Sequence, residues 1–172
     1  GRIASKNRQE FVKGRWTARL RTWGNGQDGM FPAWWLLGAR NNEPPVQEAD
    51  EDVCWPLTGS GEIDIFEHHG TNGPGHFTAR IIDSLGYCDG GDWESMMEVI
   101  AADLDQYHEY SVEWQGEDLV FARDGIEVYR LAGRQTEALR DRFDLPQHLL
   151  ERVVEGRGDS ARAVVAAGRT LG

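Results

Sequence analysis

Three acidic side chains lie within six residues of the stretch GEIDIFEHHG, residues 61–70. Glu62, Asp64 and Glu67 are separated by two isoleucines and a phenylalanine. The apolar residues predict a buried strand, but carboxyls this close in sequence repel one another when ionised. Folding alone therefore does not favour the arrangement. Clustered carboxyls can instead act as general acid, general base and nucleophile. The alternative is a solvated edge strand that carries three acids by chance.

The spacing of the acids has a geometric consequence on a strand. Glu62 and Asp64 share one face because side chains alternate, and strict alternation sends Glu67 to the other face. A one-residue bulge near Ile65 and Phe66 would return Glu67 to the first face. Two glutamates placed in this way can hold their carboxyls about 5–5.5 Å apart, the separation found in retaining glycosidases. Asp64 between them would keep the two pKa values apart.

Short apolar runs separated by turn pairs surround this stretch. GRWTARLRTW (14–23), FPAWWLLG (31–38) and EYSVEWQGEDLVFARDGIEVYRL (109–131) read as strands, the last as three strands with turns such as Asp124-Gly125. This pattern predicts an antiparallel all-β fold with hairpins. An acidic, proline-containing loop over 41–60 directly precedes the acids. Long loops are often functional, although a surface insertion explains it equally well.

Composition limits the functional classes. The 172 residues fit one domain, and a hydrophobic share of 40% with seven tryptophans predicts a real core rather than disorder. The net charge of −11 argues against a nucleic-acid partner and an anionic membrane, and it suits a neutral substrate. No apolar run is long enough for a membrane span. Cys54 and Cys88 could form one disulfide or remain buried thiols.

Four stretches together carry a resemblance to glycoside hydrolase family 16. GEIDIFE resembles its E-h-D-h-x-E motif (h, hydrophobic), in the bulged form of laminarinases (endo-β-1,3-glucanases), agarases and carrageenases. FPAWWLLG resembles the W-P-A-F-W-x-L-G strand, and residues 1–21 resemble the entry strands. Residues 103–125 resemble the D-F-H-x-Y-x-x-E-W hairpin that ends in D-G. The matches keep the family's order and cover roughly residues 1–150.

The resemblance implies a β-jelly-roll sandwich of the concanavalin A-like lectin/glucanase type, with an open cleft on its concave sheet. It implies that Glu62 is the nucleophile, Glu67 the acid/base and Asp64 their electrostatic partner. No cofactor or metal is expected.

Candidate substrate-binding residues follow from the same resemblance: Trp35, Trp34, Trp114 and Arg19. Flat aromatic faces suit the C–H faces of pyranose rings. Alternation allows only one of the two adjacent tryptophans to face the cleft, and Trp35 matches the family's tryptophan. Core packing is the alternative for each tryptophan, and a structural ion pair is the alternative for Arg19.

The sequence also departs from the family pattern. The family has the pattern H-G-T-V-H in the strand after the acids. This chain has His76 at the first histidine of that pattern and Arg80 in place of the second histidine, a change that could shift substrate choice. Residues 151–172 lack aromatic residues and do not resemble the family's final strands, and we expect the family's opening strands to be missing as well. We therefore expect an incomplete catalytic domain over 1–150, truncated at both ends, and an atypical tail over 151–172 that could be disordered. We expect no structural calcium.

The sequence thus predicts a glycoside hydrolase: a retaining endo-β-glycanase that cleaves β-1,3-glucan by double displacement. An agarase- or carrageenase-like galactan hydrolase is an alternative. A non-catalytic β-glucan-binding module or an inactive fragment is another, but retention of all three acids favours an enzyme. The resemblance also implies a secreted monomer whose partner is a polysaccharide.

Overall fold

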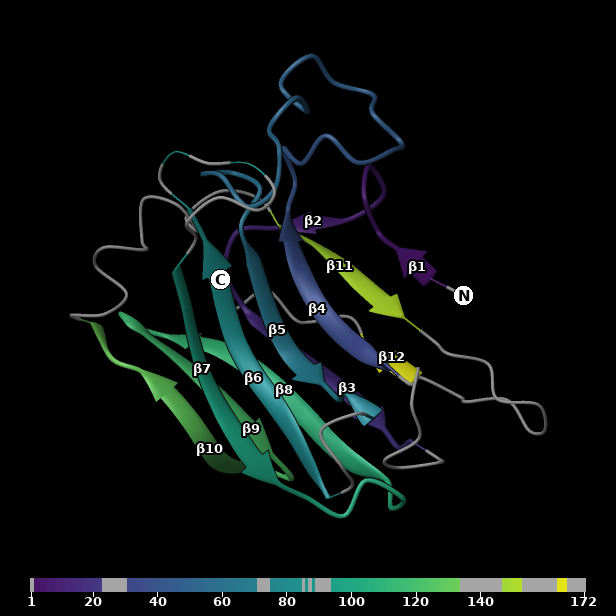
Figure 1. Cartoon of the computed structure of the whole chain (residues 1–172), viewed down its shortest axis with the longest axis vertical. Coiled ribbons are helices and arrows are strands. Elements are labelled where there is room, and N and C mark those ends of the chain that lie inside the picture. Colours follow the sequence, from purple (N-terminus) through teal and green to yellow (C-terminus); the bar gives the residue numbers. More distant parts are fainter. Residues whose placement is uncertain are drawn as a thin grey trace.

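Two antiparallel β-sheets form the computed structural model, which describes residues 2–22, 31–70, 75–84, 86, 88, 94–133, 147–152 and 164–166 (Figure 1). The seven-stranded sheet has the order β1-β11-β4-β5-β6-β7, with β2 paired to β11. Its strands are β1 (Arg2–Ala4), β2 (Glu10–Phe11), β4 (Ala33–Gly38), β5 (Glu62–Glu67), β6 (His76–Asp83), β7 (Glu94–Ala101) and β11 (Gln147–Arg152). The five-stranded sheet has the order β10-β9-β8-β3-β12. Its strands are β3 (Arg15–Leu20), β8 (His108–Gln115), β9 (Asp118–Arg123), β10 (Ile126–Leu131) and β12 (Val164–Ala166).

The hydrophobic core lies between the two sheets. Alternate residues of each central strand point into it, as the period of two in a strand requires. Buried core side chains come from both sheets: Trp16, Ala18, Trp34, Leu36, Ile63, Ile65, Phe66, Phe77, Ala79, Ile81, Tyr110, Val112, Leu119, Phe121 and Leu131. The predicted all-β jelly-roll sandwich is therefore confirmed. Within the described part of the chain, no helix has the length and apolar character needed to cross a membrane.

The hairpin between β9 and β10 turns at the predicted Asp124-Gly125 pair. Both residues have positive φ, 51° and 76°. Such values are required at the two central positions of a type I′ turn, whose twist matches that of the flanking strands. Ile126 follows the turn and is 71% exposed, so only the later part of β10 reaches the core.

β5 contains the predicted bulge. On one side Trp34 pairs with Phe66 and Trp35 with Asp64, so Ile65 has no partner of its own. On the β6 side the register also shifts between Asp64 and Glu67. The two residues within the bulge, Ile65 and Phe66, are both buried in the core. Two consecutive inward side chains reset the alternation and return Glu67 to the face of Asp64.

The long segment between β4 and β5 rises beyond the ends of these strands, in blue at the top of Figure 1. It returns close to its starting point, because a Cβ at Gly38 would lie 2.2 Å from the carbonyl oxygen of Gly59. Only glycine allows the two backbones to approach this closely. Cys54 in this segment forms a disulfide with Cys88, which settles the alternative left open by the sequence.

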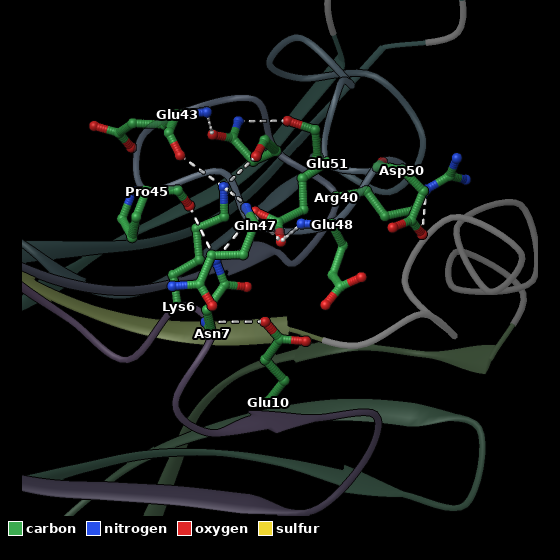
Figure 2. A network of polar contacts seen from close by, with 12 residues as sticks. Lys6, Asn7, Glu10, Arg40, Glu43, Pro45, Gln47, Glu48, Asp50 and Glu51 are labelled. Atoms are coloured by element: carbon green, nitrogen blue, oxygen red, sulfur yellow. Dashed lines mark hydrogen bonds and ion pairs between the residues drawn. The ribbon is translucent and has the colours of Figure 1, made fainter.

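Lys6 anchors the first half of the same segment to the N-terminal part of the chain (Figure 2). Its ammonium donates to the carbonyl oxygens of Asn41 (2.5 Å) and Glu43 (2.6 Å) and lies 3.0 Å from a carboxylate oxygen of Glu51. The side chains of Lys6 and Glu51 are both almost fully buried. Burial opposes ionisation of Glu51, but hydrogen bonds from Lys6, the backbone of Glu48 and Asn7 lower its pKa to about 2.

The C-terminal segment contributes to both sheets where it is described. The boundary expected at residue 150 falls within β11, which pairs with β4 and β1. β12 pairs with β3 in the other sheet. The remaining residues of the expected tail, 153–163 and 167–172, lie outside the described residues.

The Lys6–Glu51 pair yields a stability prediction. We expect Glu51→Gln to lower the Tm at neutral pH by about 5 °C or more, because it leaves a buried ammonium without its counter-charge. The pKa of Glu51 lies at about 2 instead of the ordinary 4.5. The stabilisation is therefore complete above about pH 4.5 and is lost as the pH falls toward 2. Thermal unfolding followed by circular dichroism at neutral pH and near pH 2 should show a smaller difference in Tm between variant and wild type at the acidic pH.

Arg40→Ala is the matched control in the same segment. Arg40 forms an exposed ion pair with Asp50 at 3.6 Å. Exposed pairs contribute little, so its Tm should stay within about 2 °C of the wild-type value. Equal losses in the two variants would contradict a special role for the buried pair.

Candidate active site

The three acids of β5 meet on one face of the seven-stranded sheet. One carboxylate oxygen from each of Glu62, Asp64 and Glu67 lies within 4.8 Å of the other two. Asp64 is 0% exposed and Glu67 is 5% exposed, whereas Glu62 keeps part of its surface open. The bulge described above produces this cluster, because it turns Glu67 to the side of the other two acids.

Arg80 of β6 supplies a positive charge to the cluster. It stands directly opposite Asp64 in the register of β5 and β6. Its Nε donates a hydrogen bond to Oδ2 of Asp64 at 3.1 Å and lies 3.3 Å from Oε2 of Glu67. Carboxyl oxygens at such spacing are also the ligands that a hard cation prefers. Here, however, a guanidinium already provides the counter-charge for two of the three groups.

A cavity of about 500 Å³ opens above the two glutamates. Aromatic, polar and charged side chains surround it: Arg2, Phe31, Ala33, Trp35, Leu37, Asn41, Asn42, Glu43, Cys54, Trp55, Glu62 and Glu67. β4 and β5 form its floor, and the segment between these strands supplies one wall. Arg2 pairs with Glu43 across the cavity, and its guanidinium carbon lies 5.5 Å above the ring of Trp35. The cavity thus combines flat apolar faces with hydrogen-bonding groups, as carbohydrate sites require.

Trp55 holds Glu62 from the wall of the cavity. Its indole Nε1 donates a hydrogen bond of 2.8 Å to Oε2 of Glu62. The neighbouring Cys54 ties this part of the wall to Cys88 through the disulfide. The orientation of Glu62 therefore depends on a segment outside its own strand.

The environment of Glu62 both raises and lowers its pKa, and the rise prevails. Although Glu62 keeps some exposure, protein atoms surround it closely, and burial raises its pKa. Hydrogen bonds from Asp64 and Trp55 lower that pKa, as do the charges of Arg80 and Arg2. These contacts favour the ionised form of Glu62 and so oppose the effect of burial.

Asp64 and Glu67 also have raised pKa values. Burial raises the pKa of Asp64 well above its usual range, and the charges of Glu62 and Glu67 raise it further. A protonated Asp64 can donate its hydrogen bond to Glu62. Burial likewise raises the pKa of Glu67, although Arg80 opposes this change. Carboxyls that share one site disfavour one another's ionisation, so the three acids do not all ionise together.

The structure brings one of the four expected substrate-binding residues to the cavity. Trp35 lines it and Trp34 does not, so one of the two adjacent tryptophans faces the cavity, as alternation requires. Trp34 is 1% exposed in the core, so its ring offers no surface to a sugar. Trp114 packs against the core from β8, and Arg19 lies on β3 with its guanidinium 4.4 Å above Tyr107. Trp114 and Arg19 both lie on strands of the five-stranded sheet, whereas the other sheet forms the cavity floor. Trp34, Trp114 and Arg19 thus lie outside the set of residues that line this cavity.

Sequence reasoning missed the contacts of two residues. Trp55 lies in the segment that was singled out for its length before the acids, but nothing in the sequence showed that its indole reaches Glu62. Arg80 was noticed as a departure from a motif, and the β5–β6 register reveals its contact with Asp64. Alternation along β6 would have placed Arg80 and Thr78 on the same face, but not opposite the acids.

The comparisons with known proteins agree with this arrangement. The family model of glycosyl hydrolases family 16 matches residues 1–156. A family 16 endo-glucanase from Bacteroides ovatus superposes with a TM-score of 0.67 and 22% identity, over 88% of this chain and 59% of that chain. The laminarinase catalytic domain from Thermotoga maritima gives 0.65 and 23%, over 87% of this chain and 56% of that one. No curated protein sequence matches the chain.

A laminarinase from Flavobacterium sp. UMI-01 has 27% identity and a TM-score of 0.64, over 87% of this chain and 58% of that chain. The chain therefore spans less than two thirds of the length of these solved structures. At identities below 25%, the structural likeness shows the shared fold, and the match of the family model shows the relationship. The sandwich, the acid cluster at the bulge and this match over most of the sequence lead to one conclusion: the chain belongs to glycosyl hydrolases family 16.

Proposed function

We propose that the chain carries the catalytic centre of a retaining endo-β-glycanase that hydrolyses β-1,3-glucan. The observation that carries the proposal is the convergence of Glu62, Asp64 and Glu67 beneath an aromatic cavity, with oxygens within 4.8 Å of one another. Retaining glycosidases hold their two carboxyls about 5–5.5 Å apart, whereas inverting enzymes leave about 6.5–9.5 Å for a water molecule. The short separation favours the retaining geometry.

The proposed reaction has two displacements. Ionised Glu62 attacks the anomeric carbon while protonated Glu67 gives its proton to the leaving oxygen, so a glycosyl–enzyme ester forms and the glycosidic bond breaks. Glu67, now ionised, takes a proton from water. The water oxygen attacks the anomeric carbon and displaces Glu62, so the ester bond breaks and the sugar is released. Glu62 is then ionised again and Glu67 is protonated again. Asp64 and Trp55 donate hydrogen bonds to Glu62 and keep it aimed at the cavity.

The choice of substrate rests on the relatives and on the cavity. Several similar structures are laminarinases, and a Bacteroides ovatus family 16 protein is in complex with the G4G4G3G product of mixed-linkage glucan. Trp35, Trp55 and Phe31 line the cavity, where their rings can pack against a neutral sugar chain. Mixed-linkage β-glucan is the second candidate substrate, supported by the Bacteroides ovatus proteins.

An extracellular location is part of the proposal. The Cys54–Cys88 disulfide supports it, because disulfides persist in oxidising compartments. A polymeric glucan would also be met outside the cell.

Hydrolysis assays on wild-type protein and two glutamate variants test the proposed reaction. Wild-type protein should release reducing sugar from laminarin, and Glu62→Gln should reduce release to background because the nucleophile is lost. Glu67→Gln should lower kcat by about 10²–10⁴-fold, the contribution expected of a general acid. Glu113→Gln, on the other sheet, is the matched control and should retain full activity. Lichenan, agarose and carrageenan are assayed in parallel.

The outcomes separate the candidates. Release from lichenan alone would move the substrate to mixed-linkage glucan, and release from agarose or carrageenan alone would overturn the glucan assignment. A folded wild-type protein that releases sugar from none of the four polymers would refute the enzymatic function.

Trp55→Phe tests the hydrogen bond to Glu62. The variant keeps an aromatic ring but loses the Nε1–H donor that lowers the pKa of Glu62. That pKa should rise, so the acidic limb of kcat/KM should move to higher pH. We expect kcat/KM on that limb to fall about three- to tenfold, while the rate near the optimum changes little. A uniform loss at every pH would show that Trp55 acts only in substrate binding.

Trp35→Ala tests the aromatic platform. Loss of the ring should raise KM for laminari-oligosaccharides about tenfold, because a stacked face no longer packs against the sugar. Trp114→Phe is the control and should leave KM unchanged, since Trp114 packs against the core of the sandwich. If Trp114→Phe raises KM and Trp35→Ala does not, the assignment of the platform is wrong.

A further inference from the structure

Arg80 makes unequal contacts with the three acids. Its Nε lies 3.1 Å from Asp64 and 3.3 Å from Glu67, whereas its effect on Glu62 is exerted by charge alone. The side chain is 22% exposed, and both partner carboxyls are buried. Charges in such surroundings are screened much less than at a surface. The guanidinium therefore acts most strongly on Asp64 and Glu67.

These contacts bear on the step in which Glu67 gives up its proton. A general acid must hold its proton at the working pH, and burial favours the protonated form of Glu67 by raising its pKa. A cation 3.3 Å from the carboxyl favours its ionised form instead. Arg80 would also stabilise the carboxylate that Glu67 becomes after the first displacement.

We propose that Arg80 is a positioning residue that fixes the carboxyls of Asp64 and Glu67 and sets the upper pH limit at which Glu67 serves as proton donor. The inference rests on the proposed function and deepens it. It gives the residue that departs from the family motif a role in the reaction, with no direct contact to the sugar.

The other groups around Glu67 do not replace Arg80. From β5, the charge of Glu62 raises the pKa of Glu67, whereas a hydrogen bond with Asp64 lowers it without supplying a positive charge. β4 places Ala33 opposite Glu67 and contributes no charge there. On β6, the hydroxyl of Thr78 lowers the pKa of Glu67 through a hydrogen bond and carries no charge.

More distant charges act elsewhere. Burial lowers the pKa of His69 and the charge of Arg80 lowers it further, so this histidine is largely neutral near pH 7. Arg2 acts on Glu62 and is itself paired with Glu43. In the part of the chain that the structure describes, Arg80 is the cation within ion-pair distance of Glu67.

The test compares Arg80→Gln with wild type over a series of pH values. Removal of the positive charge should raise the pKa of Glu67, so the alkaline limb of kcat/KM on laminarin should move to higher pH. Above the wild-type alkaline midpoint, the variant should retain about tenfold more of its own maximal kcat/KM. Arg80→Lys keeps the charge and should restore a limb close to wild type. Arg130→Gln removes a guanidinium from the other sheet and should leave the limb unchanged.

A second readout does not depend on activity. Protein labelled with ¹³C at the glutamate carboxyls is titrated by NMR, and the Glu67 signal is assigned by its absence from Glu67→Gln. The Glu67 signal should titrate at higher pH in Arg80→Gln than in wild type, and Arg80→Lys should reverse the change. Circular dichroism confirms that each variant is folded.

The two readouts distinguish the possible failures. An unchanged Glu67 titration in folded Arg80→Gln would overturn the inference, whether or not the protein hydrolyses glucan. A shifted titration in a protein that hydrolyses none of the four polymers would uphold the charge contact but refute the proposed function. A shifted titration with an unmoved alkaline limb would show that Glu67 is not the proton donor, and the inference about its pH limit would fall.

Discussion

The bulge in β5 is the constraint on which the rest of the site depends. A regular strand would place Glu67 in the core, where its carboxyl would have to be desolvated among apolar side chains. Instead, Ile65 and Phe66 both turn inward and fill space between the sheets. Their burial stabilises the irregular backbone by roughly 3–6 kcal/mol, taking about 1.5–3 kcal/mol for each large apolar side chain. The same packing that satisfies the core therefore aligns the acids.

The assembled acids then require a second solution, because burial disfavours three negative charges in one place. The structure meets this demand from two directions. Arg80 approaches from β6 and acts mainly on Asp64 and Glu67, while Trp55 approaches from the segment before β5 and donates to Glu62. One side of the cluster receives charge and the other receives a neutral hydrogen bond. Burial raises the pKa of all three carboxyls, and the contacts from Arg80 and Trp55 oppose this rise for different members of the cluster.

Much of this arrangement could be predicted from the sequence, for reasons that are local. The alternation of apolar residues predicted the strands, the spacing of the acids predicted the bulge, and alternation allowed only one of Trp34 and Trp35 to face the cleft. What could not be predicted was non-local. Trp114 and Arg19 lie in strands of the expected kind, but strand pattern does not say which sheet a strand joins. The contact of Arg80 with Asp64 likewise depends on the register of β5 and β6. A slip of one residue would place the side chain of Arg80 on the other face of the sheet.

The non-local contacts also explain why a short motif does not make the site. Trp55 lies in the segment between β4 and β5, which the Cys54–Cys88 disulfide fixes next to Trp55. Hydrogen bonds from the buried ammonium of Lys6 fix the first half of the same segment. The disulfide and the contact between Lys6 and Asn41 each join residues more than 30 positions apart in sequence. The six residues of β5 supply the reactive groups, but their protonation states come from neighbours on β6 and in the wall. A chain with the same motif and different neighbours would carry the acids with different pKa values.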